Sequence, residues 1–355
     1  MIASLLLSVL QQIVVPSKPD AHQPQLSVAA DGHVALAWAE KGVIRCCFGA
    51  PDDQSKFLIV HGMVPKMSYS VGMRRGPRVA ILDGDQVVLT AIGGELGGGK
   101  DGDVWSWCNV KWKTMDGWRK AVRVNSVAGS AREGIHALAR SMKGEVYCAW
   151  IDLRSGKPQI WGALSKDAGK TWENESVVSG STEICPCCAP SVAFDAKNGV
   201  CVMWRGVREG ARDMHLAVST DGGKTFGAAQ KLGSGAWKID FCPMDGGALA
   251  LDTEGKLVSA WRRETSVYLS SGADERLVGN GEQPWTAAGA IVWLEKRNAR
   301  LFALLPGAKD AETLADSAND PVIAAGPDGK GPLYVAWETG SADSSEIRLA
   351  RLAPR

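Results

Sequence analysis

The stretch "HVALAWAE", residues 33–40, is an alternating apolar run that follows a glycine-containing turn and includes a tryptophan near its end. Alternation with a period of two residues is typical of a β-strand with one buried face. The same phrase recurs, with the tryptophan kept or replaced, as "QVVLTAIG" (86–93), "EVYCAWID" (145–152), "VCVMWRG" (200–206), "LVSAWRR" (257–263), "AIVWLEK" (290–296) and "LYVAWET" (333–339). Seven copies predict a repeated β unit.

Each copy lies within a longer series of predicted strands. A strand and a turn such as "SVAADG" (27–32) precede it, and a third and a fourth alternating run follow, as in "MHLAVS" (214–219) and "AAQKLG" (228–233). Repeated four-stranded antiparallel units predict an all-β fold, a β-propeller, whose closure into a ring protects strand edges. The count favours seven blades, with six as the alternative. We expect the recurring tryptophans to fill the wedges between blades.

The two ends of the chain bear on how the ring closes. The last unit, residues 320–353, supplies only three strands, and the apolar N-terminal segment contains "QQIVVPS" (11–17). Residues 1–16 are therefore expected either to provide the closing strand or to be the remnant of a signal peptide. Residues 17–355 are expected to form a single propeller domain. No run reaches the roughly 18 apolar residues of a membrane span.

Composition excludes some classes of partner. Lys and Arg number 40 against 39 Asp and Glu, for a net charge of +1. A near-neutral chain is not a nucleic-acid or membrane-surface binder held by bulk charge, so any charge-based function has to be local. We expect an extracytoplasmic location, periplasmic or secreted, with the cytoplasm as the alternative.

Two turns carry a more specific motif. "SKDAGKTW" (165–172) and "STDGGKTF" (219–226) both fit S-x-D-x-G-x-T-(W/F), and each follows a predicted third strand. In such a turn the Asp side chain caps backbone N–H groups and Gly takes a positive φ. The chain thereby resembles the sialidase superfamily of Asp-box (BNR) propellers over nearly its whole length. In that family the Asp box marks the fold, so Asp167 and Asp221 are expected to be structural.

Antiparallel order places the loops after the second strands and the loops between units on one face, opposite the Asp-box turns. We call this the loop face; loops on a rigid scaffold are where function usually resides. Arginines and carboxylates gather there, and the planar guanidinium suits carboxylate, sulfate or phosphate groups. An anionic glycan or another anionic small ligand is therefore the expected partner. The candidate ligand-binding residues are Arg75, Arg78, Arg154, Arg205, Arg208, Arg212, Arg262, Glu133, His136 and Asp245.

The resemblance implies an exo-acting glycoside hydrolase with a carboxylate-binding arginine triad and a tyrosine nucleophile. Tyr69 is the one tyrosine expected in a loop of the right face, and "MRRGPRVAI" (73–81) lacks the usual Arg-Ile-Pro phrase. Asp152 with Glu209 is a second candidate catalytic pair, since two carboxyl groups can divide the acid and base roles. The alternative from another class is a non-catalytic propeller that binds glycan or protein partners through the same face.

The stretch "ICPCCAP" (184–190) places Cys185, Cys187 and Cys188 just before one unit, and Cys242, in "FCPMD" (241–245), holds the same place in the next. Neighbouring units would bring these loops together. A disulfide between Cys242 and Cys187 or Cys188 is the leading interpretation. The alternatives are a soft metal ion, Cu(I) or Zn, held by thiolates, and free buried thiols. No cofactor is otherwise indicated.

Overall fold

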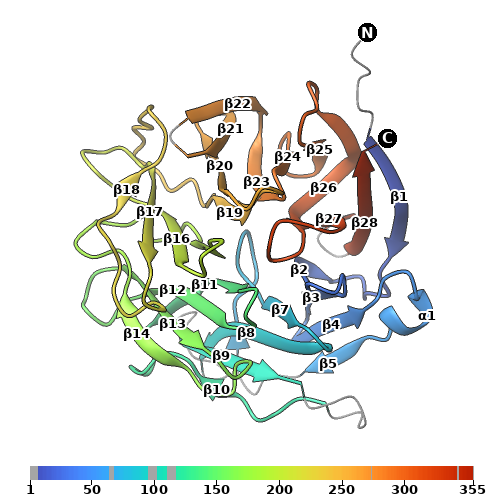
Figure 1. Ribbon diagram of the computed structural model, residues 1–355, viewed down its shortest axis with the longest axis horizontal. Coiled ribbons are helices and arrows are strands. Elements are labelled where there is room, and N and C mark those ends of the chain that lie inside the picture. The colour runs from blue at the N-terminus through green and yellow to red at the C-terminus, as the bar shows by residue number, and fades with distance from the viewer. Residues whose placement is uncertain are drawn as a thin grey trace.

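The structure is a computed structural model that describes residues 7–63, 68–94, 102–109, 117–272, 274–341 and 344–354. Its strands form sheets arranged around a central axis (Figure 1). Within the described residues, no helix is long and apolar enough to span a membrane. The one helix among the described residues is the short α1 (Gln54–Phe57), which buries Phe57.

Five of the sheets are antiparallel units of four principal strands. The first comprises β2 (His22–Val28), β3 (Val34–Glu40), β4 (Val43–Gly49) and β5 (His61–Met63). The second comprises β7 (Arg78–Leu82), β8 (Gln86–Gly94), β9 (Asp103–Cys108) and β10 (Val122–Arg123), with β6 (Ser68–Tyr69) also paired to β8. The third comprises β11 (Ala131–Arg140), β12 (Val146–Asp152), β13 (Gln159–Ser165) and β14 (Glu173–Val177). The fourth comprises β15 (Ser191–Phe194), β16 (Val200–Arg205), β17 (Met214–Ser219) and β18 (Gln230–Lys231). The fifth comprises β19 (Ala248–Leu251), β20 (Leu257–Arg263), β21 (Ser266–Ser271) and β22 (Asp274–Asn280).

The remaining strands form one seven-stranded sheet. They are β23 (Glu282–Ala287), β24 (Ala290–Leu294), β25 (Ala299–Leu304), β26 (Glu312–Ala324), β27 (Leu333–Thr339), β28 (Glu346–Pro354) and β1 (Leu7–Val14). The long strand β26 pairs with β25 through its first half and with β27 through its second. One strand thus ends one four-stranded repeat and begins the next without an intervening loop.

The blade count needs correction because of β26. The all-β propeller of four-stranded antiparallel blades is confirmed, but the count of seven separate blades is wrong as stated, and so is the alternative of six. Five blades stand alone, and the last two repeats are fused. The reason is local, since the outer strand of one repeat runs straight into the inner strand of the next and leaves no edge between them.

The N-terminal strand takes part in that fused sheet. β1 pairs antiparallel with β28, from Leu7 opposite Pro354 to Val14 opposite Arg348. The expected closing strand is therefore present; Ile13 within it and Val15 just after it are buried. Residues 1–6 of the predicted N-terminal segment lie outside the described residues. The division into segment 1–16 and domain 17–355 stays a prediction.

Tryptophans of the second strands bind the sheets together. Trp38, Trp150, Trp204, Trp261, Trp293 and Trp337 are all buried. Trp38 packs with residues of the adjoining unit such as Val322 and Tyr334, and Trp150 packs with Ile92. The wedge-filling role predicted for these side chains is confirmed, and burial of rings this large contributes much of the energy that joins neighbouring sheets.

The two motif turns have the hydrogen bonds that their sequence predicted. Asp167 accepts from the backbone N–H groups of Lys170 and Thr171 and from the Thr171 hydroxyl at 2.6 Å, while Gly169 has a φ of +78°. In the second turn Asp221 accepts from Thr225 in the same way. These contacts support the structural role expected for both aspartates. The turns join third and fourth strands, so they lie on the face opposite the loop face.

Candidate functional site at the centre of the loop face

The inner strands leave a central cavity of about 160 Å³. β2, β7, β11, β15, β19, β23 and the second half of β26 contact one another in sequence around the axis and line it. Loops that lead into these strands surround the mouth of the cavity on the loop face. Side chains from several sheets therefore converge there.

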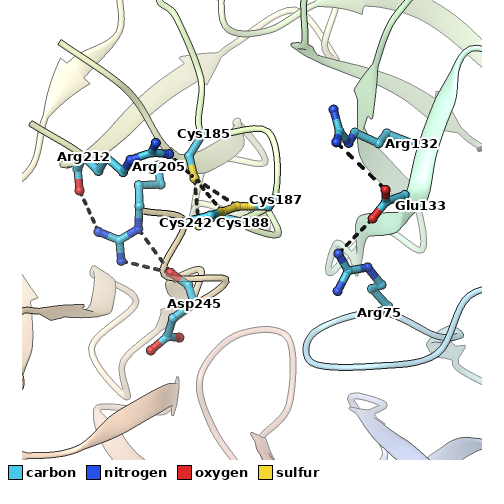
Figure 2. Close-up of a disulfide and its surroundings, with 10 residues drawn as sticks. All are labelled: Arg75, Arg132, Glu133, Cys185, Cys187, Cys188, Arg205, Arg212, Cys242 and Asp245. Carbon is cyan, nitrogen blue, oxygen red and sulfur yellow. Dashed lines mark hydrogen bonds and ion pairs between the residues drawn. A yellow bond between two sulfur atoms is a disulfide. The ribbon is translucent and has the colours of Figure 1, made fainter. Parts of the chain in front are cut away.

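Four cysteines meet at one side of this mouth. Cys185, Cys187 and Cys188 lie between β14 and β15, and Cys242 lies between β18 and β19. Their Sγ atoms all lie within 4.8 Å of one another (Figure 2). We call this group the thiol cluster. Cys187 and Cys242 are joined as a disulfide, which is one of the two pairings that the sequence left open.

The two remaining thiols of the cluster differ in their electrostatics. Cys185 lies 3.1 Å from Cys188, sulfur to sulfur, and accepts a hydrogen bond from Nη1 of Arg212 at 3.3 Å. The hydrogen bond with Cys188, assisted by Arg212, lowers the pKa of the Cys185 thiol to about 6. Burial raises the pKa of Cys188 well above its ordinary value. Cys185 is therefore the more acidic sulfur of the two.

Arg205 lies beside the thiol cluster but is committed to the backbone. Its side chain is 1% exposed. It donates two hydrogen bonds to the carbonyl of Asp245, at 3.1 and 2.9 Å, one to the carbonyl of Arg212 at 2.7 Å and one to that of Arg262 at 3.1 Å. The guanidinium thus ties together three loop-face segments. This geometry leaves it little capacity for a ligand.

A second group, the mouth cluster, is defined by Arg74, Asp245, Arg262, Gln283 and Asp320. Asp245 is fully buried; its Oδ2 accepts from the backbone N–H of Gln283 at 3.0 Å and lies 3.7 Å from Nη1 of Arg262. Its Oδ1 lies 3.7 Å from Nη2 of Arg74. The Gln283 side-chain oxygen accepts from the backbone N–H of Asp320. Figure 2 shows the Asp245 carboxylate directed away from the sulfurs.

Several buried polar atoms of the loop face have no hydrogen-bond partner among the described residues. Five of them belong to residues near the mouth, namely Arg132 Nε, Arg212 Nε, Asp245 Oδ1, Arg262 Nε and Gln283 Nε2. Buried polar groups are normally hydrogen-bonded, so each such atom needs an explanation. Four of the five are donors, and a bound molecule rich in acceptors would satisfy them.

Backbone strain occurs at the loop-face ends of the inner strands, around the mouth of the cavity. A non-glycine residue with a positive φ stands at the loop-face end of six inner strands: Gln23, Arg74, Glu133, Met244, Gln283 and Asp320, with φ between 44° and 60°. Register shifts accompany four of them. Such bulges re-aim side chains and occur often next to functional sites.

The structure places the predicted ligand-binding residues in different surroundings. Arg75 pairs with Glu133 at 3.0 Å, and Arg132 lies on the other side of the same carboxylate, across the opening from the sulfurs (Figure 2). Arg78 is buried and its donors go to backbone carbonyls, including that of His136. His136 is itself buried and bonded to Thr90, and burial lowers its pKa to about 3. Arg208 is exposed and forms an ion pair with its neighbour Glu209.

The predicted catalytic residues are not brought together. Asp152 is buried, with its oxygens accepting from Arg154, Trp150 and Ser130. Glu209 is exposed in its loop. The Tyr69 hydroxyl donates to the carbonyls of Glu40 and Val43, and burial raises the pKa of the phenol. Catalytic roles for Asp152, Glu209 and Tyr69 stay predictions without support from this arrangement.

Sequence reasoning missed Gln283 and Asp320. Asp320 lies inside the continuous strand β26, so no loop signal surrounds it. Gln283 is the second residue of β23 and looks like an ordinary strand residue. The useful signal would have been their place in the repeat. Gln283 and Asp320 stand at the loop-face end of an inner strand, where other units also carry a polar residue.

Asp320 provides a pH test of the mouth cluster. The side chain is 7% exposed, and burial, reinforced by Glu338, raises the pKa of its carboxyl to about 6. A raised folded-state pKa contributes stability below the unfolded-state value near 4, and this contribution is lost as the pH rises through 6. At pH 8, Asp320→Asn should therefore raise the free energy of unfolding, measured with urea, by about 1–3 kcal/mol, a figure that allows for loss of the pairing with Arg297. Near pH 4 the variant should be as stable as the parent. Asp316→Asn, an exposed change on the same strand, is the control, and an equal gain at both pH values would contradict the expectation.

The sheets around an axis define the fold as a β-propeller, and known structures share it. No protein-family model matches the sequence, and no curated protein matches it. A catalytically inactive virginiamycin B lyase from Staphylococcus aureus, with quinupristin, is similar with a TM-score of 0.57 at 12% identity, over 98% of this chain and 99% of that one. An α-L-arabinofuranosidase from Fusarium graminearum, in complex with an iminosugar inhibitor, has a TM-score of 0.55 at 9% identity over 96% of each chain. The polysaccharide lyase Uly1 has a TM-score of 0.55 at 12% identity, over 96% of this chain and 91% of that one. These likenesses confirm the propeller architecture that the sequence resemblance implied.

Proposed function

We propose that the protein is a glycan-binding propeller that takes an anionic, hydroxyl-rich sugar at the mouth cluster. The observation that carries the proposal is the pair of buried atoms on Asp245 and Gln283 that lack a hydrogen-bond partner, although Asp245 Oδ1 also lies in an ion pair with Arg74. Asp245 Oδ1 is a buried acceptor and Gln283 Nε2 a buried donor, on residues joined by a 3.0 Å hydrogen bond. A sugar hydroxyl donates and accepts at once, so it complements both.

Arginines around the opening also support an anionic ligand. The unpartnered Nε atoms of Arg132, Arg212 and Arg262 are donors that a carboxylate or sulfate would satisfy. Trp285 lies under Arg74, with the guanidinium carbon 4.5 Å from the ring centroid, so a broad apolar surface adjoins the polar atoms. Among the proteins of similar fold, the arabinofuranosidase was solved with an iminosugar inhibitor and another is a polysaccharide lyase.

Binding is favoured over sialidase-type hydrolysis. Tyr147 and Tyr334 are buried in strands, Tyr268 stacks on Trp261, and Tyr69 is bonded to two carbonyls, so no tyrosine belongs to the mouth cluster. Arg78 and Arg205, two of the predicted ligand arginines, are occupied by backbone carbonyls. An exo-glycoside hydrolase would need another pair of acid and base, and a carboxyl whose pKa burial raises, such as Asp320, is one candidate for the acid. For the location we propose an extracytoplasmic compartment, which the Cys187–Cys242 disulfide supports.

The test is titration calorimetry with oligosaccharides that contain uronic acid, sialic acid or sulfate, against neutral ones of equal length. Gln283→Glu keeps an acceptor for Asp320 but replaces the unpartnered donor by a negative oxygen, so affinity for an acidic sugar should fall at least tenfold. Gln159→Glu makes the same charge change on the loop face, outside the mouth cluster, and should leave affinity unchanged. Absence of binding across the panel, or equal losses in both variants, would reject the proposal; release of reducing sugar would extend it to hydrolysis.

A further inference from the structure

The thiol cluster has a geometry that the disulfide alone does not require. We propose that, once reduced, Cys185, Cys187, Cys188 and Cys242 bind one Zn²⁺ ion as four thiolates. All four sulfurs lie within 4.8 Å of one another. A Zn–S bond of about 2.3 Å in a tetrahedral site places its sulfurs about 3.8 Å apart. Cys185 Sγ lies 3.5 Å from Cys187 and 3.7 Å from Cys242, close to that edge length.

The backbone holds the ligands from two neighbouring sheets. The backbone N–H of Cys185 donates to the carbonyl of Arg205 at 2.8 Å, which fixes the first loop to the end of β16. Arg205 in turn donates to the carbonyl of Asp245, three residues after Cys242. Both loops are thus tied to one residue, the first through the Arg205 backbone carbonyl and the second through its guanidinium. A site assembled before the metal arrives loses less conformational entropy on binding.

Charge and access also suit a metal. Four thiolates with Zn²⁺ leave a net charge of −2, and Arg212 donates to Cys185 at 3.3 Å, which offsets part of it. Groups that hydrogen-bond metal ligands in this way orient them and tune affinity. Cys185 and Cys188 are 1% exposed, whereas Cys187 and Cys242 are partly exposed and provide an entry path. Four thiolates and a tetrahedral arrangement favour Zn²⁺ over harder ions.

The disulfide and the metal use the same atoms, so they are alternative states. A dithiol reductant transfers two electrons and two protons to the Cys187–Cys242 bond and is itself oxidised to a disulfide. Each of the four thiols then releases its proton as it binds Zn²⁺. Metal uptake is therefore expected only from reduced protein. This inference does not depend on glycan binding, because its ligand atoms are the four cysteine sulfurs, none of which belongs to the mouth cluster.

The experiment compares oxidised and reduced full-length chain under anaerobic conditions. Reduced protein should bind one Zn²⁺ per chain against a chromophoric chelator, and Co²⁺ in its place should give the thiolate charge-transfer absorption of a tetrahedral site. Cys242→Ser, at a partly exposed position, should lose that absorption and at least tenfold in affinity; Cys188→Ser should do the same. Cys201→Ala removes a buried thiol of β16 outside the cluster and should bind as the parent does.

Three results would overturn the inference. The first is reduced parent protein that takes up neither Zn²⁺ nor Co²⁺ with thiolate absorption. The second is equal uptake by oxidised and reduced protein, since the disulfide withdraws two of the four ligands. The third is retention of Cu⁺ against a Cu⁺ chelator by protein that releases Zn²⁺ readily, which would assign the site to copper instead. Circular dichroism of each variant establishes that loss of binding is not loss of fold.

Discussion

Replacing Arg205 by Met is expected to lower the free energy of unfolding by about 3–5 kcal/mol, because three carbonyls lose their donor and each unsatisfied buried group costs about 1–3 kcal/mol. The side chain is 1% exposed and donates to the carbonyls of Asp245, Arg212 and Arg262. Methionine keeps much of the volume but provides no donor. Urea unfolding of parent and variant measures the difference.

The same loop offers the control for this prediction. Arg208 is three residues further on, its side chain is 83% exposed, and Arg208→Met should change stability by less than about 0.5 kcal/mol. Equal effects of the two substitutions would show that the Arg205 hydrogen bonds carry no particular weight. The Cys242 loop should also loosen in Arg205→Met, because the guanidinium holds it through the Asp245 carbonyl, whereas the Cys185 loop is held by the Arg205 backbone carbonyl.

Ile13→Asp should cost at least about 4 kcal/mol, which combines the loss of a buried aliphatic side chain with the burial of an unpaired charge. Ile13 is 4% exposed and lies opposite Leu349 in the pairing of β1 with β28. The expected physical event is opening of the ring at its closure, where the N-terminal strand completes the last repeat. Thermal and urea unfolding report it as a lower midpoint.

Val14→Asp is the matched control at the neighbouring position. Val14 is 53% exposed because successive strand residues point to opposite faces, so this change should stay within about 0.5 kcal/mol of the parent. If Ile13→Asp were as mild as Val14→Asp, β1 would not be packed against the sheet, and the ring would have to close without it.

Much of the fold could be predicted from local pattern. The alternation in "HVALAWAE" and its copies predicted the second strands, and the tryptophans in them are buried between sheets as expected. The motif turns around Asp167 and Asp221 have their predicted hydrogen bonds. These features depend on residues within a few positions of one another, so they can be predicted from the sequence alone. The blade count was wrong because β26 has no turn at the point where one repeat becomes the next.

The candidate site was only partly predictable. Repeat order alone predicted that Cys242 would approach the "ICPCCAP" loop, and it does. The role of each arginine was not predictable, because a guanidinium at the end of a strand can face a ligand or the carbonyls of a neighbouring sheet. Arg205 and Arg78 donate to backbone carbonyls.

The sequence by itself predicted the repeat, the strand order within each unit and the face that carries the cysteines and arginines, and it left the closing role of β1 as one of two alternatives, which the pairing with β28 decided. Only the tertiary structure decided which polar atoms remained unsatisfied, and it selected Asp245, Gln283 and Asp320 over Asp152 and Glu209 as the residues that meet at the axis. The reason is physical: strand pattern follows from local alternation and burial, whereas the pairing of a buried charge depends on groups from other sheets, such as Arg74 beside Asp245, that only the assembled ring brings close together.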